Sequence, residues 1–366
     1  MKKMPRKLRS LWGVTPIINI IHNARAESLL GIESDTLVFS NYHTTNRFKY
    51  NFSRWCKTQP MKLILPFFLF PWALFHYDIF HFYFDRGILP SWKWRGINPF
   101  ELWLLKKLGK KVFVYTYGAD IRTRKITEAL GGYHACLHCP APGKFCVCSE
   151  EKHFRNYNRV CSFATEIFSM GDMTEDTPGS YNALFFWPVD VEEVPYVGPA
   201  GNKRGTVNIV HSPNHRFFKG TDYLIKVVEK LKKEGLPIEL NVVERVSNER
   251  ALEMYCQADI LAEQFLIGWH GFTAIEAMAL GKPVISYIRK REYLLQPDEC
   301  PIVSANPDEL EEVLRDLAQH PEKREWLGRR GREYVEKYFS LAAFAERLRK
   351  IYLHHGILNG ASAVAN

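Results

Sequence analysis

Several patterns that would assign a protein to a special class are missing from this chain of 366 residues. It has no internal repeat and no low-complexity tract, which excludes solenoid arrays and disordered repeats. Its eight cysteines lack the spacing of a secreted disulfide framework. The basic N-terminus precedes a short apolar run that Pro16 and Asn19 interrupt, with no small-residue cleavage site, so we expect no signal peptide.

The sequence also lacks an unbroken apolar segment of membrane-spanning length. Residues 61–84 come nearest, because they are mostly apolar and long enough to cross a bilayer. Two prolines, a histidine and Asp78 interrupt them, and a charge near mid-span costs about 2.5–3.5 kcal/mol. We therefore expect a helix over about 60–75, then a buried strand over 78–84, and no transmembrane span.

Acidic residues are scarce in the first half. Residues 1–200 contain 25 Lys and Arg against 17 Asp and Glu, whereas residues 201–366 contain 24 against 23. A basic, aromatic-rich half is suited to nucleic acid, to an anionic lipid surface or to a phosphate-bearing substrate. No nucleic-acid-binding module accompanies the charge, so nucleic acid is the least favoured of these partners.

The length suits two α/β domains. Apolar strands alternate with helical patterns in both halves, which predicts parallel βαβ units. In the first half we predict strands over 8–13, 36–40, 78–84, 111–117, 160–169 and 184–187, and helices over 19–30 and 99–108. In the second half we predict strands over 206–211, 238–243, 259–262 and 283–287, and helices from Thr221 and over 248–257, 272–280, 307–319, 321–337 and 340–355.

A proline-rich, charged stretch over 192–204 predicts the linker between the domains. The expected N-terminal domain covers 1–195 and carries a Cys-rich insertion at about 134–150. The expected C-terminal domain covers 205–340. Residues 341–366 are expected to form a C-terminal helix that packs back toward the N-terminal domain.

The most informative segment is 258–285, in which Gly271 precedes a short helix. The first turn of that helix, with Phe272 and Thr273, presents amide N–H groups and a positive dipole end to an anion such as a diphosphate. Glu276 lies one turn inside, where its carboxylate can accept hydrogen bonds from a ribose diol. An ordinary capped helix with a solvated Glu276 explains these residues equally well.

The run Glu276-Ala-Met-Ala-Leu-Gly-Lys-Pro-Val284 resembles the C-terminal signature of retaining GT-B glycosyltransferases of the family-four type. The resemblance implies two Rossmann-like domains with parallel sheets facing across a cleft, and a nucleotide-sugar donor bound by the second. The family has a glutamate near the donor sugar eight residues before Glu276, where this chain has Gly268. Glu263 or His270 would then take its place.

A second motif, HSPNHRFFKGT over 211–221, ends a strand and begins a helix. In the family a Lys-Gly pair and an arginine clamp the donor diphosphate here, and Lys219-Gly220 matches the pair. Asn214 occupies the arginine's usual place, so Arg216 is the candidate substitute. Two cations beside a pyrophosphate neutralise the charge on the departing nucleotide. A solvated basic loop is the alternative.

On the acceptor side, the segment KVFVYTYGADIR over 111–122 resembles the family's strand and small-residue loop. Tyr117 and Asp120 are candidates to orient or polarise an acceptor hydroxyl. Asp120 is equally well explained as a loop cap.

Four cysteines form the last motif, in HACLHCPAPGKFCVC over 134–148. A Cys-x2-Cys pair and a Cys-x-Cys pair provide four thiolates, which suit one tetrahedral structural zinc. Free thiols and an iron–sulfur cluster are the alternatives. The proposed zinc ligands are Cys136, Cys139, Cys146 and Cys148.

Together these features predict a glycosyltransferase of the hexosyltransferase kind that acts in polysaccharide or glycolipid assembly. It would need no cofactor for catalysis, use a carbohydrate or lipid-linked acceptor, and work in the cytoplasm, on the inner face of an anionic plasma membrane. The alternatives are a sugar-nucleotide epimerase of the same fold, and an inactive, zinc-stapled binding protein.

Overall fold

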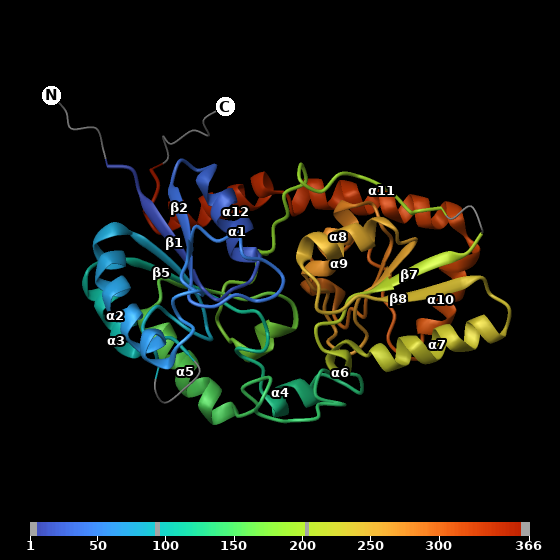
Figure 1. The fold of residues 1–366 in the computed structure, drawn as a ribbon, viewed down its shortest axis with the longest axis horizontal. Coiled ribbons are helices and arrows are strands. Elements are labelled where there is room, and N and C mark those ends of the chain that lie inside the picture. Colours follow the sequence, from blue (N-terminus) through green and yellow to red (C-terminus); the bar gives the residue numbers. More distant parts are fainter. Residues whose placement is uncertain (1–5, 92–95, 202–204, 360–366) are drawn as a thin grey trace. The chain divides into compact units, whose positions relative to one another are not determined.

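A computed structural model describes residues 6–91, 96–201 and 205–359, which form two compact α/β units (Figure 1). Unit 1 comprises residues 1–123, 145–188 and 341–366, and unit 2 comprises residues 124–144 and 189–340. Residues 202–204 of the predicted linker and 360–366 of the predicted C-terminal segment lie outside the described residues.

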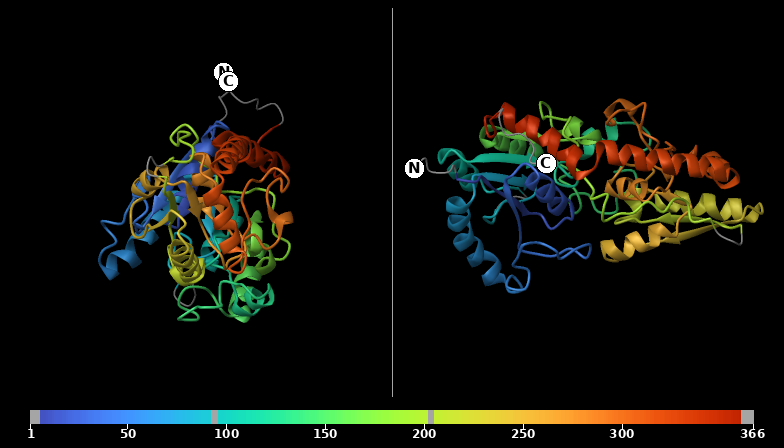
Figure 2. Two further views of the ribbon diagram at one scale, coloured as in Figure 1. Left: turned by 90° about the vertical axis from the view of Figure 1, so that its right-hand side faces the viewer. Right: turned by 90° about the horizontal axis from the view of Figure 1, so that it is seen from above.

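Unit 1 is built on a six-stranded, all-parallel sheet. Its strand order is β3 (Tyr50–Asn51), β2 (Glu33–Val38), β1 (Arg9–Val14), β4 (Ile79–Tyr83), β5 (Lys111–Tyr115) and β6 (Glu166–Phe168). The helices are α1 (Asn19–Ser28), α2 (Gln59–His76), α3 (Pro99–Lys107), α5 (Glu150–Phe163) and α12 (Leu341–His354), with a 3-10 turn at Gly171–Asp176. In two views, α1 and α12 cover one face of the sheet and α2, α3 and α5 cover the other (Figures 1 and 2).

A buried carboxylate ties α12 to the sheet of unit 1. Glu27 on α1 accepts hydrogen bonds from Ser10 Oγ at 2.5 Å and from Trp12 Nε1 at 2.6 Å. The hydroxyl of Tyr352, on α12, also donates to Glu27. Burial opposes ionisation of Glu27, but His81 and the hydroxyl donors outweigh it and lower its pKa to about 2.

Unit 2 is built on a four-stranded parallel sheet in the order β10 (Val284–Ile285), β9 (Ile260–Ala262), β7 (Val207–His211) and β8 (Ile238–Val242). Its helices are α4 (Arg124–Ala129), α6 (Arg216–Lys219), α7 (Thr221–Lys233), α8 (Asn248–Cys256), α9 (Phe272–Ala279), α10 (Leu310–Gln319) and α11 (Pro321–Tyr338). A 3-10 turn covers Arg291–Tyr293. Helices α7 and α10 lie on one face of the sheet, and α8, α9 and α11 lie on the other (Figure 1).

The apolar face of α7 explains why this segment is a helix. Leu224, Val228 and Leu231 recur at helical spacing and are buried in one core with Ile209 and Ile260 of the sheet. The charged side chains of α7 point to solvent, so the element is amphipathic as its sequence predicts.

Two strands predicted in the first half differ from the structure. The strand predicted over 160–169 is confirmed only at β6, residues 166–168. Residues 160–163 belong to helix α5, because His153, Tyr157 and Val160 bury one helical face and Ser149 caps its start. Residues 184–187 are buried but form no strand, since Arg347 of α12 donates to the carbonyls of Leu184 and Phe185 that a neighbouring strand would otherwise use.

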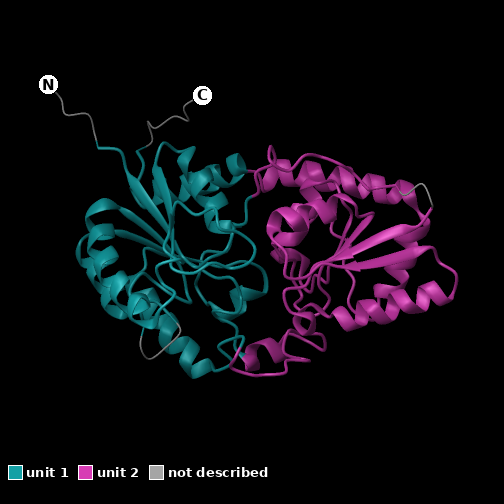
Figure 3. Ribbon diagram, in the orientation of Figure 1, with its two compact units in different colours: residues 1–123, 145–188, 341–366 teal, residues 124–144, 189–340 magenta. Residues whose placement is uncertain are grey.

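The segment 124–144 lies with unit 2, although the sequence prediction puts it in the first domain (Figure 3). The Tyr133 hydroxyl donates to Asp308 at 2.7 Å, and Arg289 Nη2 donates to the Tyr133 carbonyl at 2.8 Å. His138 Nε2 lies 2.9 Å from the hydroxyl of Tyr223. These contacts between distant parts of the chain have no local sequence signal.

Among the helices of the described residues, none combines the length and the apolarity that a bilayer crossing requires.

Candidate functional site

The predicted donor-binding residues meet at the carboxyl edge of the unit 2 sheet. Strands β7 and β9 are parallel and end at His211 and Ala262, and the loops that follow them lead to Lys219 and Gly271. Ligands of open α/β sheets bind at this edge. The structure therefore brings together Lys219 and Gly271, which lie 52 residues apart in the sequence.

Glu263 is the centre of this cluster. Its carboxylate accepts the Gly271 N–H at 2.8 and 2.9 Å, Lys219 Nζ at 3.2 Å and Ser286 Oγ at 3.2 Å. The predicted anion site is the first turn of α9, and in the structure the amide of Gly271, which precedes that turn, is bonded to Glu263. The start of α9 does hold an anion, but that anion is the protein's own carboxylate.

Lys219 is buried, with only 11% of its side chain exposed. Its ammonium group also donates to Gln264 Oε1 at 2.5 Å, so Gln264 is a member of the cluster that the sequence analysis missed. Gly220 has a φ of +73°, and a Cβ there would lie 3.2 Å from Phe265 and Leu266. The glycine of the Lys-Gly pair is thus required by backbone geometry.

Glu276 is buried inside α9, and Asn248 Nδ2 donates to its Oε1 at 2.6 Å. Burial raises the pKa of Glu276 to about 7, and the hydrogen bond from Asn248 opposes that rise. Asn248 is a second residue that sequence reasoning missed, because its position at the start of α8 marks it only as a helix-initiating residue.

Gly268 adopts a φ of +85°, a conformation that a side chain disfavours. The place where its Cβ would lie is filled by the guanidinium of Arg289, which donates to the Ile267 carbonyl at 3.1 Å. A glutamate at this position would therefore face both backbone strain and a steric overlap. Arg289 is a third residue without a sequence signal.

Two histidines line the same region. His211 lies between the Ala262 carbonyl and Thr221 Oγ1, each 2.7 Å from a ring nitrogen, and burial lowers its pKa to about 4. His270 is buried beside Gly271, and burial lowers its pKa as well. Both rings are therefore neutral near pH 7.

Arg216 and Asn214 differ from the residues of the buried cluster in their exposure to solvent. Both are exposed, and the Arg216 guanidinium pairs with Glu244 at 2.6 and 3.0 Å. Phe272 and Thr273 are half-buried at the first turn of α9. The role of Arg216 as a phosphate-binding cation stays a prediction, and it would require exchange of its carboxylate partner for a phosphate.

The carboxyl edge of the unit 1 sheet carries a second polar cluster. Asp120 Oδ1 accepts the N–H groups of Tyr117 and Gly118 at 3.0 and 2.9 Å, so Asp120 caps this loop. Asp85, which the sequence analysis missed, accepts from Thr15 Oγ1 at 2.6 Å. Asp85 follows β4 and Asp120 follows β5, and these strands are adjacent and parallel.

Within the described residues, three buried polar atoms of this cluster have no hydrogen-bond partner: Tyr83 Oη, Thr116 Oγ1 and Asp120 Oδ2. Burial raises the pKa of Asp120 to about 7, and the nearby charge of Asp85 adds to the rise. Unpaired buried polar groups are costly, so they mark a place where a ligand's hydroxyls can bind.

The four cysteines of the predicted zinc site are divided between the units. Cys136 and Cys139 belong to unit 2, whereas Cys146 and Cys148 belong to unit 1, and none of the four forms a disulfide bond within the described residues. In the part of the chain that the structure describes, no three His, Cys, Asp or Glu side chains are grouped as a metal site requires. The structural zinc stays a prediction.

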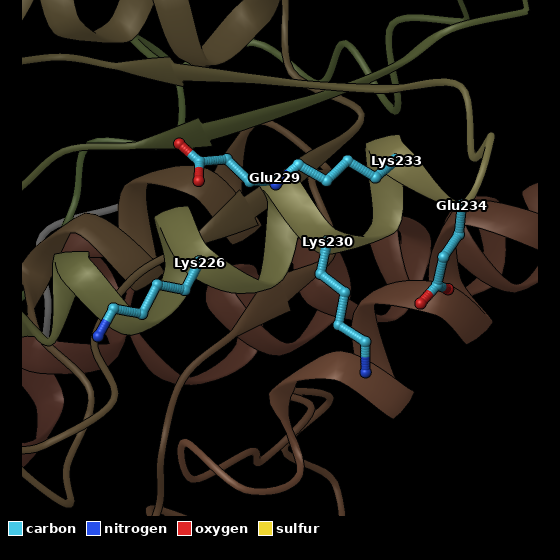
Figure 4. A pocket seen from close by; sticks show the side chains of 5 residues that line it. All are labelled: Lys226, Glu229, Lys230, Lys233 and Glu234. Carbon is cyan, nitrogen blue, oxygen red and sulfur yellow. The ribbon is translucent and has the colours of Figure 1, made fainter.

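A shallow depression on α7 is lined by Lys226, Glu229, Lys230, Lys233 and Glu234 (Figure 4). It contains none of the predicted donor-binding residues. Lys230 pairs with Glu311 and Glu234 pairs with Arg315, both at the surface. This is a solvated face of a helix with mixed charges.

Residues 210–350 match the protein family described as glycosyl transferase-like. No curated protein is similar enough in sequence to count as a relative. Among solved structures, sucrose-phosphate synthase from Thermosynechococcus elongatus is similar with a TM-score of 0.60 and 14% identity, covering 95% of this chain and 99% of that one.

Two further structures have the same arrangement of elements. HepE from Anabaena, in complex with UDP-glucose, has a TM-score of 0.57 and 10% identity, covering 95% of this chain and 100% of that one. A glycosyltransferase from Rickettsia africae has a TM-score of 0.53 and 14% identity, covering 97% and 100%. The predicted GT-B fold, two Rossmann-like units with parallel sheets, is confirmed. The prediction of a glycosyltransferase is confirmed at the level of this fold and the matched domain.

Proposed function

We propose that this protein transfers a hexosyl group from a nucleotide-diphosphate sugar to an acceptor hydroxyl, with retention of anomeric configuration, in polysaccharide or glycolipid assembly. The proposal rests on one observation above the others. The buried Lys219, the start of α9 and the buried Glu276 lie at the carboxyl edge of the unit 2 sheet. A lysine and a helix start are groups that bind a diphosphate, and a carboxylate can bind a ribose diol.

The diphosphate would bind at Lys219 and the first turn of α9. Lys219 has a third N–H beyond the two it donates to Glu263 and Gln264. The amides of Phe272 and Thr273 follow Gly271 and lie where the dipole of α9 is positive. Glu263 would position both groups, because its carboxylate bonds to Lys219 and to the Gly271 amide at once.

Glu276 would accept hydrogen bonds from the ribose diol, with Asn248 orienting the carboxylate. This role requires the ionised form, and burial raises the pKa of Glu276 to about 7. Nucleotide binding would therefore weaken as the pH falls below about 7. HepE, a protein of the same fold, is known in complex with UDP-glucose, which supports a nucleotide-sugar donor here.

In the transfer, the bond between the anomeric carbon and the diphosphate oxygen breaks, and the acceptor oxygen bonds to that carbon. The acceptor's proton passes to a base, and the diphosphate leaves with its charge stabilised by Lys219 and the start of α9. Because these groups neutralise the leaving diphosphate, we propose that no divalent metal is needed for catalysis.

The acceptor would be bound by unit 1, at the cluster of Asp120, Asp85 and Tyr83. Asp120 Oδ2 and the Tyr83 hydroxyl lack partners among the described residues and can bond to sugar hydroxyls. With a pKa of about 7, Asp120 is able to take up or release a proton near neutral pH. Tyr117 forms an edge-to-face contact with Tyr83, at 5.8 Å between ring centres, and would shape this site.

A lipid-linked acceptor on an anionic membrane surface, on the cytoplasmic side, would suit the basic and aromatic first half. The four cysteines at 136–148 would add a structural zinc that plays no part in the chemistry. The zinc proposal is tested by the zinc content of the purified protein, measured by atomic emission with and without cysteine-to-serine changes at Cys136 and Cys139.

Thermal shift with a panel of nucleotides and nucleotide sugars tests the donor site. A ligand at a hundred times its Kd adds about 2.7 kcal/mol of stability. We expect stabilisation by nucleoside diphosphates that Glu276→Ala removes and that Glu239→Ala, a change of an exposed glutamate on β8, leaves intact.

Turnover then separates the three functions considered for this sequence. A transferase releases free nucleoside diphosphate faster when an acceptor is supplied. Acceptor-independent isomerisation of a nucleotide sugar would favour the epimerase, and binding without turnover on any acceptor would favour the inactive binding protein. Absence of nucleotide binding would contradict the proposal.

A further inference from the structure

Helix α2 of unit 1 carries large apolar side chains that are exposed as well as apolar side chains that are buried. Pro66, Phe70, Ala73 and Leu74 are buried. At 100° per residue, the exposed large side chains fall within one arc of about 140°, which adjoins the arc of the buried residues. These are Leu63 at 45% exposed, Ile64 at 49%, Phe67 at 45%, Phe68 at 71% and Phe75 at 83%.

Such a row of exposed apolar side chains is uncommon on a soluble surface and marks a site of interaction. Two views show α2 along the outer edge of unit 1 (Figures 1 and 2). Trp55, just before the helix, is 66% exposed and extends the row. An indole has an apolar body and a polar N–H, which suits the boundary between water and lipid.

The segment of the chain that carries this row has charged residues of one sign only. Between Asp35 and Asp78 the sequence has no acidic residue but contains five Lys and Arg. Arg54, Lys57 and Lys62 are exposed, and in the described part of the chain none of them is ion-paired with an acidic side chain. The apolar row therefore has a basic border with unused charge.

We infer that this α2 surface, the exposed side chains of residues 54–75, docks on an anionic phospholipid membrane. The helix would lie in the plane of the interface with Phe68 and Phe75 among the acyl chains, and the basic border would contact lipid phosphates. It would not cross the bilayer, since no described helix has the length and apolarity for that.

A second copy of the chain fits this surface less well. In a two-fold dimer the same surface faces itself, so the basic border of one copy would face the basic border of the other without an acidic partner. An anionic membrane supplies the opposite charge. The inference extends the proposed lipid-linked acceptor, and it depends on unit 1 alone rather than on the donor site.

Sedimentation with phospholipid vesicles tests this inference. We expect the full-length protein to bind vesicles that contain phosphatidylglycerol, to bind phosphatidylcholine vesicles much more weakly, and to dissociate as salt is added. The double change Phe68→Ser and Phe75→Ser should weaken binding at least tenfold, because each phenylalanine loses its burial in the lipid. The change Lys57→Glu with Lys62→Glu should weaken binding to the anionic vesicles by a similar factor.

Trp326→Ser is the matched control, because Trp326 is 54% exposed on α11 of unit 2 and lies outside the α2 surface. It should leave vesicle binding unchanged. The α2 changes are at exposed positions, so melting temperature and its increase with nucleoside diphosphate should stay as in the wild type. That readout reports the donor site, so failure of the proposed function is distinguished from failure of the membrane inference.

Three results would overturn the inference: no binding of the wild type to anionic vesicles, equal binding to neutral vesicles, or binding that survives the Phe68 and Phe75 changes. A dimer by light scattering that the same changes convert to a monomer, without vesicle binding, would instead assign the surface to a second copy.

Discussion

The carboxyl edges of the two sheets are equivalent positions in two similar units, yet their polar groups are arranged differently. At the unit 2 edge, Glu263 bonds to Lys219, to Ser286 and to the start of α9. At the unit 1 edge, Tyr83 Oη, Thr116 Oγ1 and Asp120 Oδ2 are buried without partners among the described residues. One edge is organised around an internal ion pair, and the other retains unused hydrogen-bonding capacity.

The difference indicates what each edge can bind. A compact charged cluster that positions a lysine and a helix start suits a ligand of fixed shape and charge, such as a diphosphate. Unpaired hydroxyl and carboxyl groups suit a ligand that brings its own donors and acceptors, such as a sugar. The following changes test this contrast, from the largest expected effect to the smallest.

Lys219→Met should have the largest effect, because it leaves the Glu263 carboxylate buried without its cation. We expect the free energy of unfolding to fall by about 3–5 kcal/mol, as measured by urea denaturation. Lys226→Met, at an exposed position of α7, is the control and should change it little. A loss below about 1 kcal/mol in the Lys219 variant would show that the ion pair does not organise this edge.

Glu276→Ala should remove the ribose contact while leaving the Lys219 cluster in place. Hydrogen bonds to a charged group contribute about 1.5–3 kcal/mol, so nucleotide affinity measured by calorimetry should fall about tenfold to a hundredfold. Glu276→Gln should lower affinity less and should abolish the weakening of binding below pH 7. An unchanged pH profile in the Gln variant would assign the titration to another group.

Gly268→Ala should destabilise unit 2 more than Gly235→Ala. Both glycines have a positive φ, at +85° and +89°, so both changes carry about 1–2 kcal/mol of backbone strain. Only at Gly268 would the new Cβ also meet the Arg289 guanidinium, whereas nothing lies within 4 Å at Gly235. Equal losses of stability in the two variants would show that Arg289 moves aside freely.

Asp120→Asn should have the smallest effect at neutral pH and a characteristic pH dependence. Burial raises the pKa of Asp120 to about 7 in the folded protein, whereas in the unfolded chain it is about 4. The folded protein therefore keeps this proton longer, and its free energy of unfolding falls as the pH rises from about 4 to about 7. The variant cannot ionise, so its melting temperature should fall less than that of the wild type between pH 5 and 8. Parallel curves would place the Asp120 pKa near its ordinary value.

The alternation of helices and strands was predictable because it depends on local periodicity. The amphipathic pattern of α7 and the apolar run of β5 each identify one element from its own residues. Prediction failed for residues 160–163, the first part of the strand predicted over 160–169, and for residues 184–187, where apolar residues suggest strands. In the first case helical spacing of the buried residues decided the structure, and in the second Arg347 took the backbone acceptors.

For the candidate site, the sequence predicted Lys219, Gly220, Gly271 and Glu276 from their order along the chain and from a family resemblance. It did not identify Gln264, Asn248, Arg289 or Asp85 as members. No local sequence pattern marks these four side chains, because their partners are determined by packing between elements that lie far apart in the sequence.

The sequence by itself determined the two α/β halves, the helix starts and the glycines, because backbone preferences and hydrophobic periodicity act over a few residues. Only the tertiary structure decided that Glu263 holds the start of α9, that Arg289 fills the space beside Gly268, and that the segment 124–144 lies with unit 2. Hydrogen bonds and ion pairs between distant residues form only after the chain has folded, so no local pattern encodes them.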